Sequence, residues 1–296
     1  MLYHWPARKQ EVRWPKHADL IYDVGFHHGE DTAFYLKKGF RVVAFEAHPR
    51  LAEKGRVLFA DAARDGRFTM VEGAIISAED WTAGKREVTF YTNNPQDGWG
   101  TTQPDWAARS ARVGAASSAV TVAAVDFVNC LRTQGVPHFT KIDIEGSDRW
   151  CLDALRHVVD RPDFVSIERD RSQGSEAQPE LDQLQSLGYR GFQVVQQSRV
   201  PWQSVPNPSR EGNGCTHRFT LDSSGPFGAE LPADGWMDRD GIATVYEMIF
   251  ARERAFGEKS LLRRIPGMGR ILWTIEKYTG LPFPGWYDTH ARLAPP

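Results

Sequence analysis

Short runs of hydrophobic residues alternate with longer segments of helical period along most of the chain. The hydrophobic runs at 20–25 (LIYDVG), 41–46 (RVVAFE), 68–75 (FTMVEGAI), 139–146 (FTKIDIEG) and 163–168 predict buried strands. Strands that alternate with helices in this way are typical of a parallel sheet with helices on both faces. The pattern therefore predicts an α/β fold with a Rossmann-like doubly wound sheet.

The rest of the chain departs from this regular alternation. Residues 86–91 alternate like an edge strand, and the Gly-, Thr-, Pro- and Ser-rich stretch that follows them predicts either a functional loop or a disordered one. The runs at 191–197 and 216–222 predict a final antiparallel pair, which makes the sheet mostly parallel with its last strand antiparallel.

We divide the chain into an N-terminal extension (1–18), a Rossmann-like domain (19–223) and a C-terminal helical appendage (224–296). The appendage either covers the site, forms a wall of the substrate pocket, or makes a subunit contact in a homo-oligomer.

Composition excludes several classes of protein. The 296 residues are 41% hydrophobic, and 36 Lys+Arg against 38 Asp+Glu give a net charge of −2, which offers no general field for a nucleic acid. Cys130, Cys151 and Cys215 form no CxxC pair, so neither a disulfide framework nor a zinc site is expected. Because no signal-peptide pattern or apolar stretch of about 18 residues is present, we expect a cytoplasmic protein without a transmembrane segment.

The first candidate site is the stretch DVGFHHG, from Asp23 to Gly29, between a predicted strand and a helix. Glycines let a backbone turn tightly, and a helix N-terminus offers unpaired N–H groups to an anionic group. Glu46 ends the next strand about 20 residues after Gly25, where an acidic side chain takes the ribose hydroxyls of an adenosine cofactor. His27 stands where a dinucleotide-binding turn needs its second glycine, which favours S-adenosylmethionine over NAD.

The second candidate site lies at the ends of two later strands. Asp143 and Glu145 belong to the string KIDIEG, and Glu168 ends the next strand. Ligands of open α/β sheets sit beyond the carboxyl ends of the strands, so these three carboxylates are the candidate catalytic bases. Alternatively, Asp143 orients the cofactor's ammonium group and Glu145 caps a helix. A carboxylate cluster can also hold Mg²⁺, but the sequence does not indicate a metal and we favour a metal-free base.

An aromatic and hydroxyl-rich loop is the candidate substrate-binding segment. Its residues Trp99, Thr101, Thr102 and Trp106 suit stacking on, and hydrogen bonding to, a sugar or planar ring. The alternative is a surface loop that the two tryptophans fix in place. Near the C-terminus, WYDTH brings Asp288 and His290 together, and we interpret them as a surface pair rather than as part of a site.

The motifs from Asp23 to Pro49, VTVAAVDFVNCL, KIDIEGSDRWCLDAL and RPDFVSIE together resemble the FkbM family of S-adenosylmethionine-dependent methyltransferases. The resemblance implies transfer of a methyl group to a hydroxyl of a sugar, glycan or secondary metabolite. Phe26 and His27 replace the family's usual Ala-Asn, whereas the K-I-D-x-E-G string is intact. The resemblance and the motifs together give these cofactor-binding candidates: Asp23, Gly25, His27, Gly29 and Thr32 at the methionine end, Glu46 at the ribose, Ala74 and Ile75 beside adenine, and Asp143.

Two other functions remain open from the sequence. A binding protein that keeps the fold without turnover would release no S-adenosylhomocysteine with any acceptor. A nicotinamide-dependent oxidoreductase would be stabilised against heat by NAD instead of S-adenosylmethionine. The expected partner is a small-molecule or carbohydrate acceptor.

Overall fold

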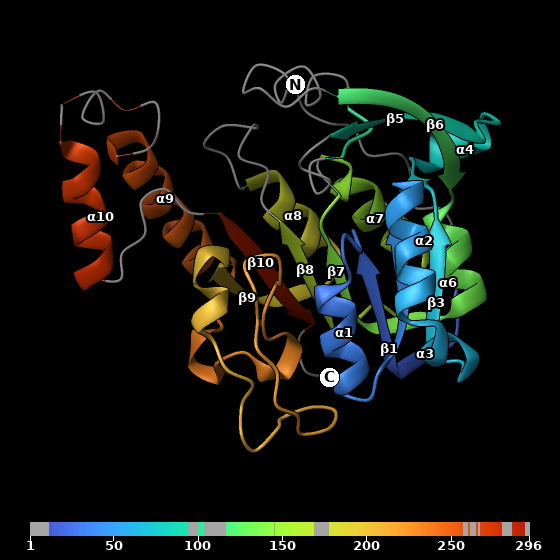
Figure 1. Ribbon diagram of the computed structural model, residues 1–296, viewed down its shortest axis with the longest axis horizontal. Helices are drawn as coiled ribbons and strands as arrows, with labels where there is room; N and C mark the ends of the chain where they lie inside the picture. The colour runs from blue at the N-terminus through green and yellow to red at the C-terminus, as the bar shows by residue number, and fades with distance from the viewer. Residues whose placement is uncertain are drawn as a thin grey trace.

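A computed structural model describes residues 12–93, 100–103, 117–144, 146–168, 178–256, 260, 265, 267–279 and 286–293. A central sheet runs through the molecule, with helices on both of its faces (Figure 1). In the described part of the chain, no helix combines the length and the apolar character that crossing a membrane requires.

The central sheet has seven strands in the order β3-β2-β1-β7-β8-β10-β9. Their bounds are β1 Lys16–Val24, β2 Arg41–Glu46, β3 Phe68–Glu72, β7 Val136–Ile142, β8 Phe164–Glu168, β9 Tyr189–Gln196 and β10 Tyr287–Leu293. All pairs are parallel except those of β10, which runs antiparallel to both β8 and β9. The predicted fold class is therefore confirmed, with the strand order reversing between β1 and β7.

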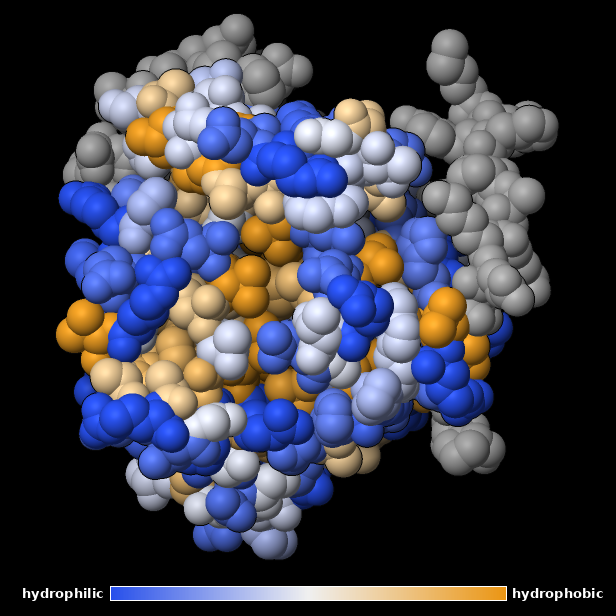
Figure 2. All heavy atoms as spheres, turned by 90° about the vertical axis from the view of Figure 1, so that its right-hand side faces the viewer, coloured by the Kyte–Doolittle hydropathy of each residue, from blue (hydrophilic) through white to orange (hydrophobic). Residues whose placement is uncertain are grey.

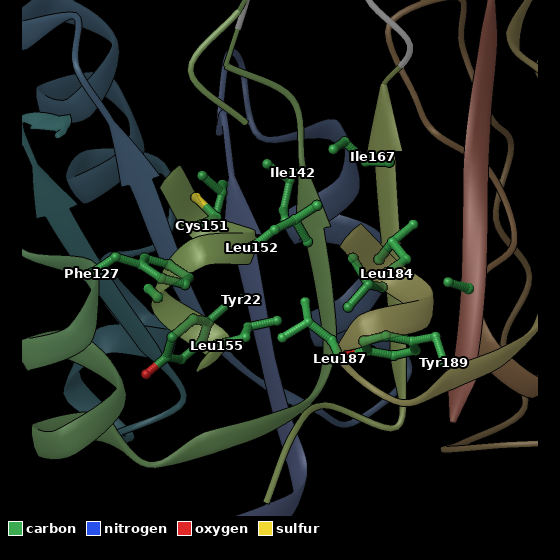
Figure 3. Packing of buried hydrophobic residues seen from close by; sticks show 14 of the residues in the cluster. Tyr22, Phe127, Ile142, Cys151, Leu152, Leu155, Ile167, Leu184, Leu187 and Tyr189 are labelled. Atoms are coloured by element: carbon green, nitrogen blue, oxygen red, sulfur yellow. The ribbon is translucent and has the colours of Figure 1, made fainter. Parts of the chain in front are cut away.

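Two groups of helices cover the sheet. On one face lie α1 Glu30–Lys37, α2 Pro49–Leu58 and α3 Ala60–Arg64, and on the other lie α6 Phe127–Gln134, α7 Asp148–Ala154, α8 Gln178–Ser186 and α9 Arg239–Phe256. The second group packs on side chains such as Tyr22, Ile142 and Ile167, which form the larger hydrophobic core (Figure 3). Asp23 is next to Tyr22 in β1, and Lys141 is next to Ile142 in β7. Because side chains alternate along a strand, Asp23 and Lys141 point to the opposite face of the sheet, toward α1.

A small sheet lies beyond β3. The pattern predicted one strand at 68–75, but the structure has two. Gly73, at φ 134°, separates β3 from β4 Ala74–Ile75. β4 pairs with β6 Ser117–Val125, which pairs in turn with β5 Glu87–Asn93. The short helix α4 Ala78–Thr82 connects β4 to β5. Figure 2 views the molecule from the side of the edge strand β3, where a hollow floored mainly by hydrophobic residues is surrounded by hydrophilic ones.

The predicted strand at 216–222 is wrong, because β10 is the strand that pairs with β9. Residues 216–222 form no strand: Phe219 is buried at 2% exposure, but Leu221 two positions later is 58% exposed. In a strand these two residues would lie on the same face of the sheet, so their different burial does not fit a strand with one buried face. Residues 197–236 instead cover the α1 side of the sheet, where Val200, Phe227 and Leu231 join its core.

The C-terminal residues contribute to the main body of the molecule. α9 packs on the larger core through Ile242, Tyr246 and Phe250, and β10 lies inside the central sheet. The helix α10 Met268–Thr279 lies beyond α9 (Figure 1). A separate role for residues 224–296, as a lid or as a subunit contact, stays a prediction.

A histidine joins the covering segment to the sheet. His138 of β7 places Nδ1 2.8 Å from Asp163 and Nε2 2.8 Å from Glu211, whose other oxygen accepts from the N–H of Ala229. Burial opposes the charge on this ring, but the hydrogen bonds to Asp163 and Glu211 outweigh burial and raise the pKa of His138 from 6.5 to about 9. The imidazolium therefore ties β7 to residues 211–229.

We expect His138 to make stability depend on pH. Its contribution is fully present below pH 6.5, the unfolded value, and is lost as the pH rises through about 9. The difference corresponds to about 3 kcal/mol. Urea unfolding from pH 6 to 9.5 measures it, and the contribution of His138 is the difference between the parent and His138→Gln. A difference that does not change over this range would contradict the prediction.

Candidate functional site

The loop between β1 and α1 is a tight backbone turn. Gly25 and Gly29 have φ of 92° and 86°, and His27, at 54°, is a non-glycine residue with positive φ. A side chain at position 25 would meet the carbonyl oxygen of Asp143 at 1.9 Å, so only glycine lets this loop approach the end of β7 so closely. Gly29 is the N-cap of α1 and has no side chain that could cap the first turn. This helix N-terminus therefore suits a carboxylate or another anionic group.

Glu46 at the end of β2 is held in a fixed orientation beside this loop. Its Oε2 accepts from the N–H of His27 at 2.9 Å, and its Oε1 accepts from the N–H of His48 at 2.7 Å. Each carboxylate oxygen keeps a further lone pair. Burial raises the pKa of Glu46 to about 7, although the two N–H donors oppose the shift. The carboxyl group is therefore oriented before any ligand arrives, and it can accept two hydroxyl groups.

A buried cation lies beneath the loop. The Nζ of Lys141 is 3.1 Å from Asp31, 3.6 Å from Asp23 and 3.7 Å from Asp143, and it donates to the carbonyl of Gly25 at 3.2 Å. Thr32 of α1 donates to the other oxygen of Asp23 at 2.6 Å. Lys141 thus joins β1, α1, β7 and the glycine loop, and we call Lys141 with Asp23, Asp31 and Asp143 the Lys141 cluster.

One cation faces three carboxyl groups in the Lys141 cluster. Burial alone would lower the pKa of Lys141, but the attraction of Asp31, Asp23 and Asp143 outweighs it and holds the pKa well above its ordinary value. Burial raises the pKa of Asp23 to about 7, against the opposing effect of Lys141. Asp23 is fully buried, whereas the side chain of Asp143 is 37% exposed. Asp143 is therefore the carboxylate of the cluster that a ligand reaches directly.

The predicted catalytic carboxylates lie at the carboxyl edge of the sheet. Asp143 directly follows β7 and Glu168 ends β8, and the preceding residues Ile142 and Ile167 are partners in the ladder. Glu145 lies outside the described residues. Sequence reasoning missed that β10 brings Asp288 to this edge, directly opposite Glu168.

The remaining candidates lie around this edge. Ala74 and Ile75 are buried in β4, immediately after Gly73, whose N–H donates to the carbonyl of Glu46. Thr101 is buried and pairs with Tyr91, and Thr102 shares a hydrogen bond of 2.9 Å with Ser147 at the start of α7. The structure therefore brings residues 101–102 beside the loop after β7. Trp99 and Trp106 lie outside the described residues.

The interpretation of Asp288 and His290 as a surface pair is wrong. They are 5% and 2% exposed and face α1 from within the sheet. The sequence indicated exposure for both residues because their side chains are polar. Lys141 and Asp31 are the other polar residues of the site to which the sequence gave no role. The signal for Lys141 was its place at the start of KIDIEG, inside a predicted buried strand. A buried lysine needs carboxylate partners, so it also indicated that acidic residues such as Asp31 lie nearby.

In the part of the chain that the structure describes, no group of three or more His, Cys, Asp or Glu side chains is placed to hold a metal ion. The carboxylates Asp23, Asp31 and Asp143 are arranged around an ammonium group instead. The site thus has an oriented carboxyl at β2, a glycine loop over a cation, and carboxylates at the ends of β7, β8 and β10.

Several solved structures are similar to this chain. Among solved structures, the methyltransferase FkbM from Methylobacillus flagellatus is 18% identical with a TM-score of 0.31, over 52% of this chain and 33% of that one. The match thus spans about a third of the Methylobacillus protein. An S-adenosylmethionine-dependent methyltransferase from Geobacter sulfurreducens, solved with S-adenosyl-L-homocysteine, is 10% identical with a TM-score of 0.34, over 95% and 86% of the two chains. These likenesses are too low to carry a functional argument, and no curated protein matches the chain.

The assignment rests on a family match. The model of the methyltransferase FkbM domain matches residues 23–191, which is more than half of the chain and runs from Asp23 of the glycine loop through Glu168 into β9. This chain therefore belongs to the FkbM methyltransferase family, the family of S-adenosylmethionine-dependent methyltransferases that its motifs resemble.

Proposed function

We propose that this chain binds S-adenosylmethionine at the loop after β1 and methylates a hydroxyl oxygen of a sugar, glycan or secondary metabolite. The observation that carries the proposal is Glu46, whose two oxygens are fixed by the N–H groups of His27 and His48 beside a glycine loop. Paired hydroxyl groups of a ribose match a carboxyl group held in this way.

The residues of the loop fit the rest of the cofactor. The uncapped N-terminus of α1, after Gly29, suits the methionine carboxylate, and the exposed carboxylate of Asp143 suits the ammonium group. Asp23 and Thr32 are buried behind the loop, so they support it from below. Ala74 and Ile75 would contact the adenine, since they follow the strand next to Glu46.

When bound, S-adenosylmethionine supplies a methyl group on a sulfonium, which is already activated for transfer. The protein then has to align the acceptor oxygen, exclude water and take up one proton. Glu168 is the residue that we assign to the proton, because it ends β8 at the carboxyl edge next to Asp143. Thr101 and Thr102 would position the acceptor from the side of α7.

Replacing Glu46 by glutamine is expected to weaken binding of S-adenosylmethionine about 10- to 100-fold. Hydrogen bonds to a charged group contribute about 1.5–3 kcal/mol, and an amide presents one acceptor oxygen instead of two. Isothermal titration calorimetry with S-adenosylmethionine and with S-adenosylhomocysteine measures the change.

Glu72→Gln is the matched control for this measurement. Glu72 ends β3 directly opposite Glu46, but its carboxylate pairs with Arg56 at the surface. We expect its variant to bind both ligands like the parent. A parent protein that gives no heat with either ligand would overturn the proposed function. Binding without release of S-adenosylhomocysteine across a panel of sugar and polyketide alcohols would indicate a binding protein without turnover.

A further inference from the structure

A row of polar side chains crosses the α1 face of the sheet, one step below the carboxyl edge. The ladders pair Asp23 with Lys141, Lys141 with Ser166, Ser166 with His290, and His290 with Gln193. Cross-strand partners lie on the same face of a sheet. The row therefore runs continuously from β1 to β9, and Ser166, His290 and Gln193 extend it beyond the Lys141 cluster.

These three extending residues are buried, yet part of their polarity is unsatisfied. Their exposed fractions are 1%, 2% and 6%, and the atoms Ser166 Oγ, His290 Nε2 and Gln193 Oε1 have no hydrogen-bond partner within the described part of the chain. A buried polar atom left without a partner destabilises the fold, because it has lost its hydrogen bond to water and gained none in return. Three of them in neighbouring positions of one row point to a ligand that supplies the missing hydrogen bonds.

Water fits this place better than a larger ligand. Neighbouring strands are about 4.8 Å apart, and one water bonded to two atoms spans about 5.5 Å between them. The row offers three partners: a hydroxyl, an amide oxygen and a ring nitrogen. A buried water typically makes about three hydrogen bonds. Burial lowers the pKa of His290 to about 3, so its ring is neutral and requires no counter-ion.

Two further groups connect this row to the carboxyl edge. Asp288 lies two residues before His290 on the same face of β10, opposite Glu168. Burial and the charge of Asp143 raise the pKa of Asp288 well above its ordinary value, which favours the protonated form of this carboxyl group. Tyr35 of α1 is fully buried, its hydroxyl lacks a partner among the described residues, and its pKa is raised by burial and by the charges of Asp31 and Asp23. Tyr35 packs against Phe139 of β7, so its hydroxyl is on the same side of the sheet as the row.

We propose that Ser166, His290 and Gln193 hold ordered water behind the carboxyl edge of the sheet, and that this water connects Asp288 to the Lys141 cluster as a path for a proton. The role of the path rests on the proposed function. In methylation of a hydroxyl, the acceptor O–H bond breaks, the O–C bond forms, the C–S bond breaks, and one proton is left at the carboxyl edge. Glu168 takes this proton from the acceptor oxygen, and Asp288, directly opposite Glu168, receives it and passes a proton on to the water. A carboxylate of the Lys141 cluster then keeps the proton until product leaves.

A crystal structure at about 1.5 Å and two substitutions test the proposal. We expect ordered water within hydrogen-bond distance of Ser166 Oγ and His290 Nε2 in the parent, and its loss in His290→Leu. Ser166→Ala and His290→Leu should lower kcat about 10-fold, less than the 10²–10⁴ that a direct base contributes, and should change the solvent deuterium isotope effect. The affinity for S-adenosylmethionine should stay unchanged.

Thr140→Val is the matched control. Thr140 is 1% exposed and its hydroxyl also lacks a partner among the described residues, but it points to the opposite face of β7. Its variant should keep the parent's kcat and isotope effect. A dry row in the parent crystal, or parental kcat and isotope effect in both row variants, would overturn the proposal. Failure of the parent to bind S-adenosylmethionine would instead remove the proposed function, and the crystallographic test of the water site would still stand.

Discussion

Replacing Lys141 by methionine is expected to lower the free energy of unfolding by about 3–5 kcal/mol, the usual result of removing one partner from a buried ionic group. The ammonium group of Lys141 is within 4 Å of Asp23, Asp31 and Asp143. Methionine fills a similar volume but leaves those carboxylates without a cation. Urea unfolding followed by circular dichroism measures the loss.

The loss should be larger at pH 8 than at pH 5. Lys141 opposes the effect of burial on Asp23, so its removal raises the pKa of Asp23 further above the unfolded value. A carboxyl group shifted in this direction loses stability as the pH rises through its folded pKa, and Asp23 already has a pKa of about 7 in the parent. At pH 5 Asp23 is largely neutral, and less charge is left unpaired.

Lys16→Met is the matched control for Lys141→Met, because Lys16 pairs with Asp163 near the surface at 28% exposure. Such pairs contribute about 0–1 kcal/mol. The double variant Lys141→Met/Asp31→Asn should recover part of the loss, since it removes the carboxylate nearest to the ammonium. A loss below 1 kcal/mol in Lys141→Met would show that the Lys141 cluster does not depend on its cation.

The parts of this site that lie close together in the sequence could be predicted. Residues 41–46 are an uninterrupted apolar run that ends in an acid, and this pattern predicted both β2 and the position of Glu46. The glycine loop was equally visible, because Gly25 and Gly29 flank the start of a helix. Strand, turn and helix are each determined by nearby residues, and the parallel sheet follows from their alternation.

The parts that depend on distant contacts could not be predicted. β10 pairs with β9 across 90 intervening residues and with β8 across 118, so no local pattern distinguished it from the wrongly predicted strand at 216–222. Asp288 and His290 are polar, and polarity predicted exposure. Their burial makes sense only once Lys141, Ser166 and the cover from residues 197–236 are in place, and these come from separate parts of the chain.

The segment 197–236 is the least regular part of the fold, and a second buried ion pair fastens it. Lys38, directly after α1, pairs with Glu230, and both side chains are completely buried. Ser209 contacts both partners, with its Oγ 2.5 Å from Lys38 Nζ and 2.9 Å from Glu230 Oε1. Lys38, Ser209 and Glu230, which are far apart in the sequence, therefore meet at this ion pair.

Lys38→Met is expected to destabilise the protein by about 3–5 kcal/mol, because it leaves the Glu230 carboxylate buried without its cation. Thermal and urea unfolding measure the change. The cover lies over the α1 side of the row that contains Ser166 and His290, so faster hydrogen exchange in residues 209–231 should accompany the loss.

The double variant Lys38→Met/Glu230→Leu separates the value of the pair from the penalty of an orphaned charge. Replacing a buried pair by apolar residues of similar size is often neutral or stabilising, so the double variant should be more stable than Lys38→Met alone. A double variant as unstable as the single one would mean that the hydrogen bonds of Ser209 and Arg210 to Glu230 hold the segment, independently of Lys38. The charge pair would then be a consequence of the cover's position instead of its cause.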